Sequence, residues 1–326
     1  MSQQHPPRSP DVTDEESQAL EALAVRLGRL YVRQRLGLER EFEQRMFRRN
    51  THFPHVTNTH SARRLIQAGL RLGGLYGRGR RNARRIETRM HQVSSARLPS
   101  AFDGFTILQL TDVHADITDD FIDTIIAAIR PLTYDVCVLT GDYRAHTYGD
   151  FRPALAAMVR LRPHIKGATY GVLGNHDSIR MVPGLEQAGY RMLINECTEL
   201  RCENQTIYLA GVDDAHSYRL DNFDRAAEHR DAERFTILLS HTPETYRRAS
   251  HADIDLMLSG HTHGGQICLP GGVPIITEAG SPRRLVRGPW QHGGMKGYTS
   301  AGAGTSILDV RLNCPPEVTL HVLRRR

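Results

Sequence analysis

Apolar residues at helical spacing mark the first part of the chain. They recur every three or four positions, the period of one face of an α-helix: Leu20, Leu23, Leu27 and Leu30. This spacing predicts one helix from about residue 14 to residue 48, broken near Gly37. We expect its apolar face to pack on the rest of the protein or on a second copy of the chain.

A second amphipathic stretch, residues 62–90, is denser in charge. It holds nine arginines, and its apolar residues are Leu65, Ile66, Leu70, Leu72, Leu75 and Tyr76. Such a stretch can lie on an anionic bilayer, bind the phosphates of RNA or DNA, or form a solvated surface. Four glycines weaken the expectation of a continuous helix: Gly73, Gly74, Gly77 and Gly79.

From Phe105 onward, short apolar runs alternate with helix-like segments, which is typical of α/β folds. Helices are predicted near residues 119–129 and 152–161. The predicted strands are residues 105–110, 135–140, 168–173, 207–211, 235–239, 255–259 and 318–323.

Charge divides the chain into two parts. With 326 residues, 40% apolar and 24% charged, it is long enough for one large α/β domain and an extension. Residues 1–100 contain 19 arginines, no lysine and nine acidic residues, whereas residues 101–326 contain 23 basic and 27 acidic residues. We therefore expect a basic, mainly helical extension over 1–100 and the main domain over 101–326. The basic extension favours nucleic acid, anionic lipid or a phosphorylated substrate.

Composition also excludes several classes of protein. No stretch approaches the roughly 18–20 consecutive apolar residues of a membrane span, and acidic residues and Arg26 interrupt the N-terminal segment where a secretory signal would be apolar. The five cysteines are odd in number and include no CxxC pair, so neither a disulfide framework nor a structural zinc site is expected. We expect a cytoplasmic protein with peripheral contact to the inner face of the membrane through residues 62–90.

Polar groups follow the predicted strands at the point where each strand ends. They are Asp112 and His114, Asp142, Asn175 to Asp177, His241, and His261 and His263. Ligands of open α/β sheets gather beyond the carboxyl ends of strands, so these groups are expected to converge on one site. Carboxylate, amide and imidazole donors without a thiolate suit Mn²⁺, Fe or Zn²⁺. Gly141, Gly174 and Gly260 each precede a candidate ligand, where close backbone approach or an unusual φ is expected.

The ordered set DxH, GD, GNHD, a lone His and GHxH resembles the calcineurin-like metallophosphoesterase superfamily over about residues 105–323. Residues 240–243, 260–266, 302–306 and 313–317 resemble its bacterial YkuE-like phosphoesterase branch. The resemblance implies a four-layer α/β/β/α sandwich that holds two divalent metal ions. The implied ligands are Asp112, His114 and His263 for one ion and Asn175, His241 and His261 for the other, with Asp142 bridging both.

The resemblance also implies catalytic roles for two neighbouring residues. His176 would stabilise the transition state or protonate the leaving oxygen, and Asp177 would orient its ring. One position departs from the family pattern, because the second Asp often found three residues after the bridging one is Ala145 here. The adjacent Arg144 and His146 are candidates for contact with a substrate phosphate, or are surface residues.

These observations predict a metal-dependent phosphoesterase that hydrolyses phosphoester or pyrophosphate bonds with hydroxide activated by two metals. The basic extension favours a membrane-proximal substrate, such as a phospholipid head group or a lipid-linked nucleotide sugar. One alternative is a phosphodiesterase of nucleic acid or cyclic nucleotides, which the 6% aromatic content makes less favourable. The other is a catalytically silent scaffold that binds partners through residues 14–48; the complete set of ligand positions speaks against it.

Overall fold

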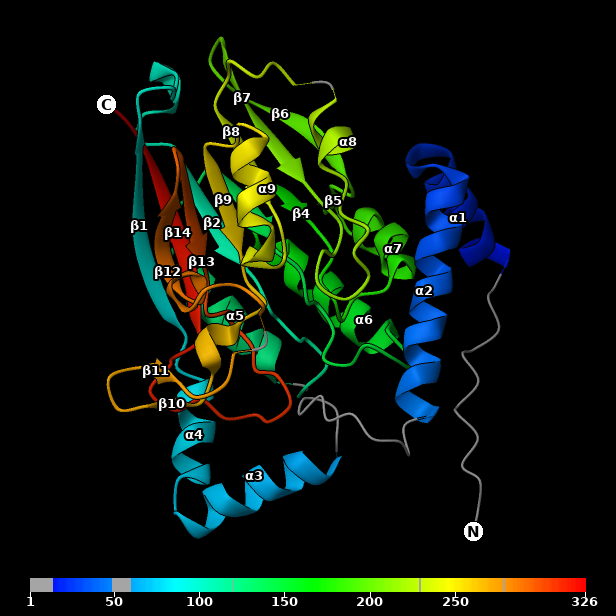
Figure 1. The fold of residues 1–326 in the computed structure, drawn as a ribbon, viewed down its shortest axis with the longest axis vertical. Coiled ribbons are helices and arrows are strands. Elements are labelled where there is room, and N and C mark those ends of the chain that lie inside the picture. Colours follow the sequence, from blue (N-terminus) through cyan, green and yellow to red (C-terminus); the bar gives the residue numbers. More distant parts are fainter. Residues whose placement is uncertain (1–13, 49–59, 119, 229, 278) are drawn as a thin grey trace.

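Two six-stranded sheets form the centre of the protein (Figure 1). The computed structural model describes residues 14–48 and 60–326 apart from 119, 229 and 278. The first sheet runs in the order β1 (Glu87–Ser95), β14 (Glu317–Arg325), β2 (Thr106–Leu110), β3 (Val136–Leu139), β4 (Ala168–Gly171) and β5 (Arg191–Met192). The second runs in the order β12 (Gly288–His292), β13 (Met295–Thr299), β9 (Leu256–Ser259), β8 (Thr236–Leu239), β7 (Gln205–Gly211) and β6 (Glu196–Cys202).

Helices cover the outer face of each sheet. Over the first sheet lie α5 (Phe121–Ile129), α6 (Arg152–Leu161) and α7 (Val182–Gln187), and over the second lie α8 (Phe223–Ala227) and α9 (Tyr246–His251). Alternation along the strands explains this layering: Ile107 of β2 is buried between the sheets, whereas its neighbour Leu108 is buried under the helices. The α/β/β/α sandwich is therefore confirmed.

The strands and helices predicted after residue 105 are all present, and their ends agree with the prediction within two residues. A short hairpin of β10 (Cys268–Leu269) and β11 (Val273–Pro274) stands apart from the two sheets. All five cysteines are free, and three of them are buried. None of the described helices is long and apolar enough to cross a membrane.

The N-terminal segment forms two helices, α1 (Asp14–Leu27) and α2 (Arg29–Arg48). The break falls at Gly28, so the predicted break at Gly37 is wrong. Gly28 has φ of 98°, a conformation that ends helices and that L side chains avoid, whereas Gly37 lies inside α2. Leu27 and other side chains of the pair are buried in the cluster formed by α5 to α7. The predicted packing on the rest of the protein is confirmed.

Residues 62–90 do not form one amphipathic stretch. They lie in α3 (His60–Leu72), α4 (Tyr76–Ala83) and the start of β1, which pairs in parallel with β14 from Glu87 opposite Glu317 onward. The helical prediction is thus wrong for the last residues of this stretch. The division at residue 100 stays a prediction, and the pairing of β1 argues for an earlier start of the domain, near Glu87.

A chain of hydrogen bonds links the two sheets through buried polar side chains. Gln109 on β2 donates to the backbone oxygen of Ser259 on β9 (3.0 Å), and its Oε1 lies 2.9 Å from Nε2 of His321. Nδ1 of His321 lies 2.9 Å from Nδ1 of the half-buried His91. Burial, with a smaller effect of Lys296, lowers the pKa of His91 to about 4. Burial, with a smaller effect of His91, holds the pKa of His321 well below its usual range.

Acid is therefore expected to weaken the fold through this histidine pair. Both pKa values lie below the unfolded value of about 6.5, so the unfolded chain binds more protons as the pH falls below it. The free energy of unfolding should fall by up to about 1.4 kcal/mol per pH unit through His321, and by less through the more exposed His91. Urea unfolding of wild type and His321→Gln between pH 7 and pH 5 checks this. The variant should show the shallower slope, and equal slopes would contradict the assignment.

Candidate metal centre

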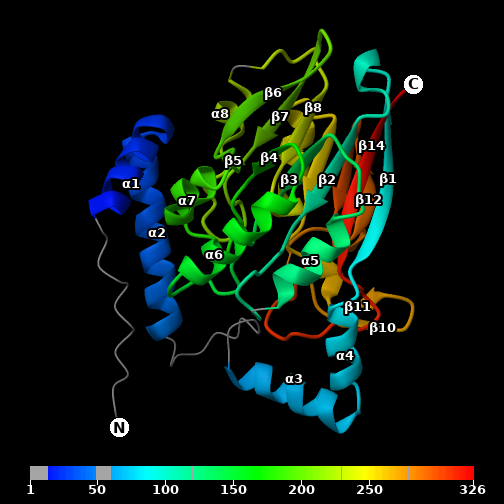
Figure 2. The same cartoon turned by 180° about the vertical axis from the view of Figure 1, so that it is seen from behind.

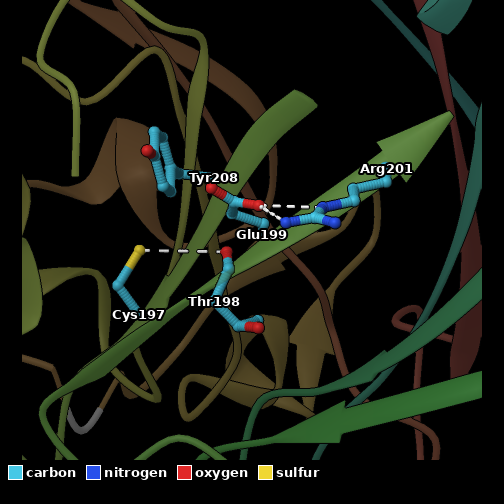
Figure 3. A pocket seen from close by; sticks show the side chains of 5 residues that line it. All are labelled: Cys197, Thr198, Glu199, Arg201 and Tyr208. Carbon is cyan, nitrogen blue, oxygen red and sulfur yellow. Dashed lines mark hydrogen bonds and ion pairs between the residues drawn. The ribbon is translucent and has the colours of Figure 1, made fainter. Parts of the chain in front are cut away.

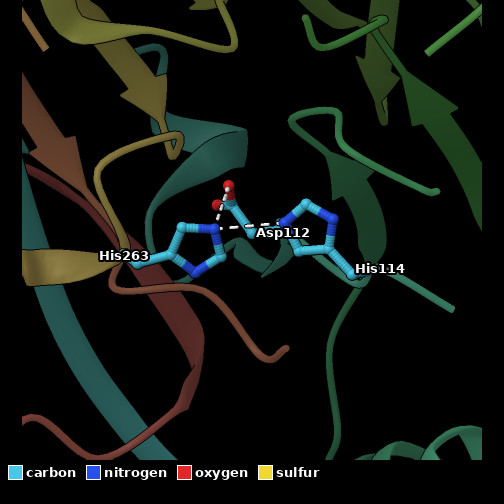
Figure 4. A group of neighbouring side chains, drawn as sticks. All are labelled: Asp112, His114 and His263. Carbon is cyan, nitrogen blue, oxygen red and sulfur yellow. Dashed lines mark hydrogen bonds and ion pairs between the residues drawn. The ribbon is translucent and has the colours of Figure 1, made fainter. Parts of the chain in front are cut away.

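All seven predicted metal ligands are buried and lie on the loops that follow β2, β3, β4, β8 and β9. Three of them form one group (Figure 4). The Nε2 atoms of His114 and His263 are 3.1 Å apart, and Nε2 of His263 lies 3.5 Å from Oδ1 of Asp112. The three side chains point toward one another, as ligands of one cation must.

A second group lies next to the first. It contains Asp142, His241 and His261, with one donor atom from each residue within 4.8 Å of the others. Nε2 of His241 is 3.0 Å from Oδ1 of Asn175 and 3.3 Å from Oδ2 of Asp142. The same Oδ2 atom lies 3.8 Å from Nε2 of His114, in the first group. Asp142 therefore lies between the two groups, where a bridging ligand is required.

Backbone conformation aims these side chains inward. Five of the seven residues have positive φ values between 44° and 71°: Asp112, His114, Asp142, His261 and His263. Such conformations cost on the order of 1 kcal/mol or more for residues with a Cβ, and they gather at functional sites. Glycines make room for the packed carboxylates, because a Cβ on Gly174 would collide with Asp142 and one on Gly260 with Asp112.

Replacing Gly260 with alanine is expected to disrupt the centre. The added Cβ would displace the Asp112 carboxylate, so the variant should lose bound divalent metal and most of its activity. Gly37→Ala is the matched control, since a Cβ at Gly37 meets no neighbouring atom and α2 gains helix propensity. Metal analysis of both purified variants decides the matter, and full metal content in Gly260→Ala would contradict the prediction.

Backbone carbonyls fix the orientation of two ligand imidazoles. Nδ1 of His114 lies 2.8 Å from the backbone oxygen of Arg144, and Nδ1 of His241 lies 2.7 Å from that of Thr140. A carbonyl oxygen only accepts, so each Nδ1 carries the hydrogen and donates. In the neutral ring each Nε2 then turns its lone pair inward, which is the tautomer that binds a metal cation.

The opposite charges of His241 and Asp142 stabilise each other inside the centre. Burial opposes a charge on His241, but Asp142 and Asp112 overcome it and raise the pKa of His241 to about 10. Burial likewise acts to raise the pKa of Asp142, yet His241 and His176 hold it well below its usual range. Among the described residues, Nε2 of the buried His261 has no hydrogen-bond partner. A nitrogen and oxygen donor set with an unpartnered buried atom fits divalent cations.

His176 lies at the edge of this centre. Its Nε2 is 3.9 Å from Oδ2 of Asp142, and its ring centroid is 5.2 Å from that of His114. Burial lowers the pKa of His176 to about 3, although Asp142 acts in the opposite direction. A neutral ring donates a hydrogen bond but carries no surplus proton. Both roles given for His176, transition-state stabilisation and protonation of the leaving oxygen, stay predictions.

Asp177 does not orient the ring of His176, so that prediction is wrong. Its carboxylate accepts hydrogen bonds from four backbone N–H groups, those of Gly174, Asp142, Tyr143 and Arg144. No partner of Nδ1 of His176 is found among the described residues. The buried carboxylate instead ties the loop after β3 to the loop after β4, because unpaired backbone N–H groups are costly in the interior.

Arg144 holds the loop that follows it. Its buried guanidinium donates to the backbone oxygens of His176, Thr147 (3.0 Å) and Gly149 (3.3 Å). The interpretation as a surface residue is therefore wrong, and the contact of Arg144 with a substrate phosphate stays a prediction. His146 is exposed with its ring near Tyr148, and its contact with a substrate stays a prediction.

Sequence analysis did not identify a contact between α2 and the loop that carries His176. Arg35 is fully buried; its Nε donates to Asp213 (3.0 Å) and its Nη2 to the backbone oxygen of Asp177 (3.1 Å). Glu39, one turn later in α2, forms an ion pair with Arg35. Its carboxylate also accepts hydrogen bonds from the Ser178 hydroxyl (2.6 Å) and from the backbone N–H of Ile179. The N-terminal helices thus hold the residues that directly follow His176.

An open pocket elsewhere in the described part of the chain has different chemistry (Figure 3). Its lining residues come from β6 and β7: Cys197, Thr198, Glu199, Arg201 and Tyr208. Arg201 and Glu199 pair with each other at 2.6 Å. None of the predicted ligands lines this pocket, so the metal centre is the candidate active site.

The fold and this centre agree with the comparisons to known proteins. The family described as calcineurin-like phosphoesterase matches residues 105–265. The chain is also 31% identical over 277 residues to the uncharacterized metallophosphoesterase YkuE of Bacillus subtilis, covering 80% of this chain and 93% of that one. The chain therefore belongs to the calcineurin-like phosphoesterase family and is an enzyme that hydrolyses phosphoester bonds.

Two further relatives are similar over most of this chain. The phosphodiesterase YaeI of Escherichia coli is 29% identical, covering 66% of this chain and 81% of that one. A transmembrane protein with metallophosphoesterase domain from Bos taurus is 32% identical, covering 72% of this chain and 56% of that one.

Proposed function

We propose that the protein hydrolyses phosphodiester or pyrophosphate bonds with two divalent cations, Mn, Fe or Zn. The observation that carries this proposal is the pair of adjacent buried donor groups with Asp142 between them. When bound, two such cations supply Lewis acidity to a phosphoryl group and lower the pKa of water. The relative named a phosphodiesterase supports cleavage of diesters.

The side chains of the protein would bind the cations and the substrate. Asp112, His114 and His263 would hold one cation, Asn175, His241 and His261 the other, and Asp142 both. His176 would donate an N–H to a phosphoryl oxygen as charge develops on it. Its backbone N–H donates to Oδ1 of Asp142 (3.0 Å), so the hydrogen-bond donor and the bridging carboxylate keep a fixed relation.

A membrane-proximal, lipid-linked substrate is the finer part of the proposal. The arginines of α3 and α4 support it, and so does the bovine relative named a transmembrane protein. Peripheral contact with the inner face of the membrane would suit such a substrate. Nucleic acid and cyclic nucleotides are the second candidate substrates, favoured by the same arginines, and a silent scaffold does not account for a complete set of donors.

A substrate screen tests the proposal. Protein loaded with Mn²⁺ is offered phosphomonoesters, phosphodiesters and nucleotide-sugar pyrophosphates. We expect cleavage of diesters or pyrophosphates that is lost after chelation and restored by Mn²⁺. A folded preparation that takes up no divalent ion, or whose activity is unaffected by a chelator, would refute it.

A further inference from the structure

Exposed apolar side chains are concentrated in two segments of the protein. Of the eleven large apolar side chains that are exposed among the described residues, three lie on α3 or just before α4, and four lie on the β10–β11 hairpin or directly after it. They are Leu65, Leu72, Leu75, Leu269, Val273, Ile275 and Ile276. Soluble surfaces rarely gather such residues without a partner.

The helix α3 lies outside the layers of the sandwich (Figures 1 and 2). It packs on α4, where Gln67 donates to the hydroxyl of Tyr76 (3.2 Å) and Arg71 lies over the Tyr76 ring. Leu72 at its end is 91% exposed. Eight arginines and no acidic residue occur in residues 60–86, so this apolar surface is surrounded by positive charge.

The hairpin and the helices are joined through residues 310–312. The backbone N–H of Arg311 donates to the backbone oxygen of Gly79 on α4 (2.9 Å). The backbone oxygen of the next residue, Leu312, accepts a hydrogen bond from the backbone N–H of Cys268 on β10 (2.9 Å). The buried guanidinium of Arg311 also donates to the backbone oxygen of His263 (3.1 Å), so the two segments lie beside the metal centre.

We propose that α3, α4 and the β10–β11 hairpin form one surface that binds an anionic bilayer. The inference rests on the proposed function and names its substrate class: phosphodiesters or pyrophosphates carried by lipids. Leucine and isoleucine side chains enter the boundary between head groups and acyl chains, while arginines pair with anionic head groups. A second copy of the chain would bring two arginine-rich faces together, and nucleic acid would leave the apolar side chains without a partner.

Vesicle co-sedimentation tests this surface. Wild type is expected to sediment with vesicles that contain phosphatidylglycerol and to stay in solution with phosphatidylcholine alone. Leu65→Ser/Leu72→Ser and, separately, Leu269→Ser/Ile275→Ser should each weaken partition about tenfold or more, since each removes two apolar anchors. Val25→Ser/Leu30→Ser is the matched control, because these exposed residues lie at the N-terminal helices, and it should bind as wild type does.

Hydrolysis of a soluble aryl phosphodiester by the same proteins separates the two proposals. We expect all of these proteins to hydrolyse the soluble diester at equal rates. The two surface variants alone should cleave a lipid-borne substrate more slowly than wild type does. Wild type that hydrolyses the soluble diester but ignores anionic vesicles would overturn the bilayer surface alone. So would equal binding by all variants, tight binding of duplex RNA in place of vesicles, or a dimer that the leucine substitutions dissociate.

Discussion

Replacing His176 with alanine is expected to lower kcat by roughly 10² to 10³-fold while the metal content stays at the wild-type level. The substitution removes one hydrogen-bond donor from the edge of the centre, and losses of this size follow removal of a donor that stabilises transition-state charge. All seven donors remain in place, because the ring of His176 is 3.9 Å from its nearest carboxylate oxygen and holds none of them. Steady-state kinetics and metal analysis on the same preparation check both parts.

The exposed His251 on α9 supplies the control, since His251→Ala removes an imidazole away from the centre. Its kcat should equal that of wild type. Loss of metal from His176→Ala would mean that His176 acts as a ligand and that its assignment here is wrong. Unchanged kcat would remove it from the mechanism altogether.

Replacing Arg35 with methionine is expected to lower kcat by up to about 10²-fold with little change in KM. Arg35 lies on α2 and touches no predicted ligand, but it donates to the backbone oxygen of Asp177, next to His176. A displacement of a catalytic group by about 1 Å can cost a factor of this size. Because KM reports ground-state binding, a positioning role predicts that the effect appears mainly in kcat.

Stability must be separated from positioning in this experiment. Methionine leaves the buried Asp213 without its cationic partner, although the Tyr31 hydroxyl still donates to its carboxylate; breaking a buried ion pair costs about 3–5 kcal/mol. The double variant Arg35→Met/Asp213→Asn removes that charge and should regain stability while kcat stays low. Arg26→Met, which breaks a contact of α1 with Glu186 at the surface, should leave kcat unchanged. Full kcat in folded Arg35→Met would restrict Arg35 to a structural role.

The metal centre could be predicted from the sequence because its ligands lie in short motifs at strand ends. The spacing of residues within one motif identified Asp112 and His114 as candidate ligands. The family resemblance assigned the ligands to two cations, and the distances between the side chains support that assignment. Asp177 was misassigned because adjacency to His176 suggested a side-chain pair. In the folded chain, four backbone N–H groups compete successfully for its carboxylate.

The misjudged elements depend on contacts between distant residues. Residues 87–95 form a strand because they pair with β14 at the far end of the chain, although most of the strand is exposed and its local pattern favours no strand. The unpredicted strands β6, β12 and β13 likewise form through hairpin pairing. Gly28 and Gly37 look alike in the sequence, and only the return of α1 onto the domain decides which of them ends a helix.

One signal for Arg35 was present in the sequence. It continues the apolar stripe of Leu27 and Tyr31 at helical spacing, and an arginine on an apolar face requires a buried partner. That partner, Asp213, lies beyond β7 and is found only in the fold.

Anomalous diffraction from crystals grown with Mn²⁺ tests the central claim most directly. We predict two manganese peaks about 3.5–4 Å apart, one within bonding distance of Asp112, His114 and His263 and the other of Asn175, His241 and His261, with Asp142 touching both. A single peak, peaks elsewhere in the molecule, or none at all would contradict a two-metal centre.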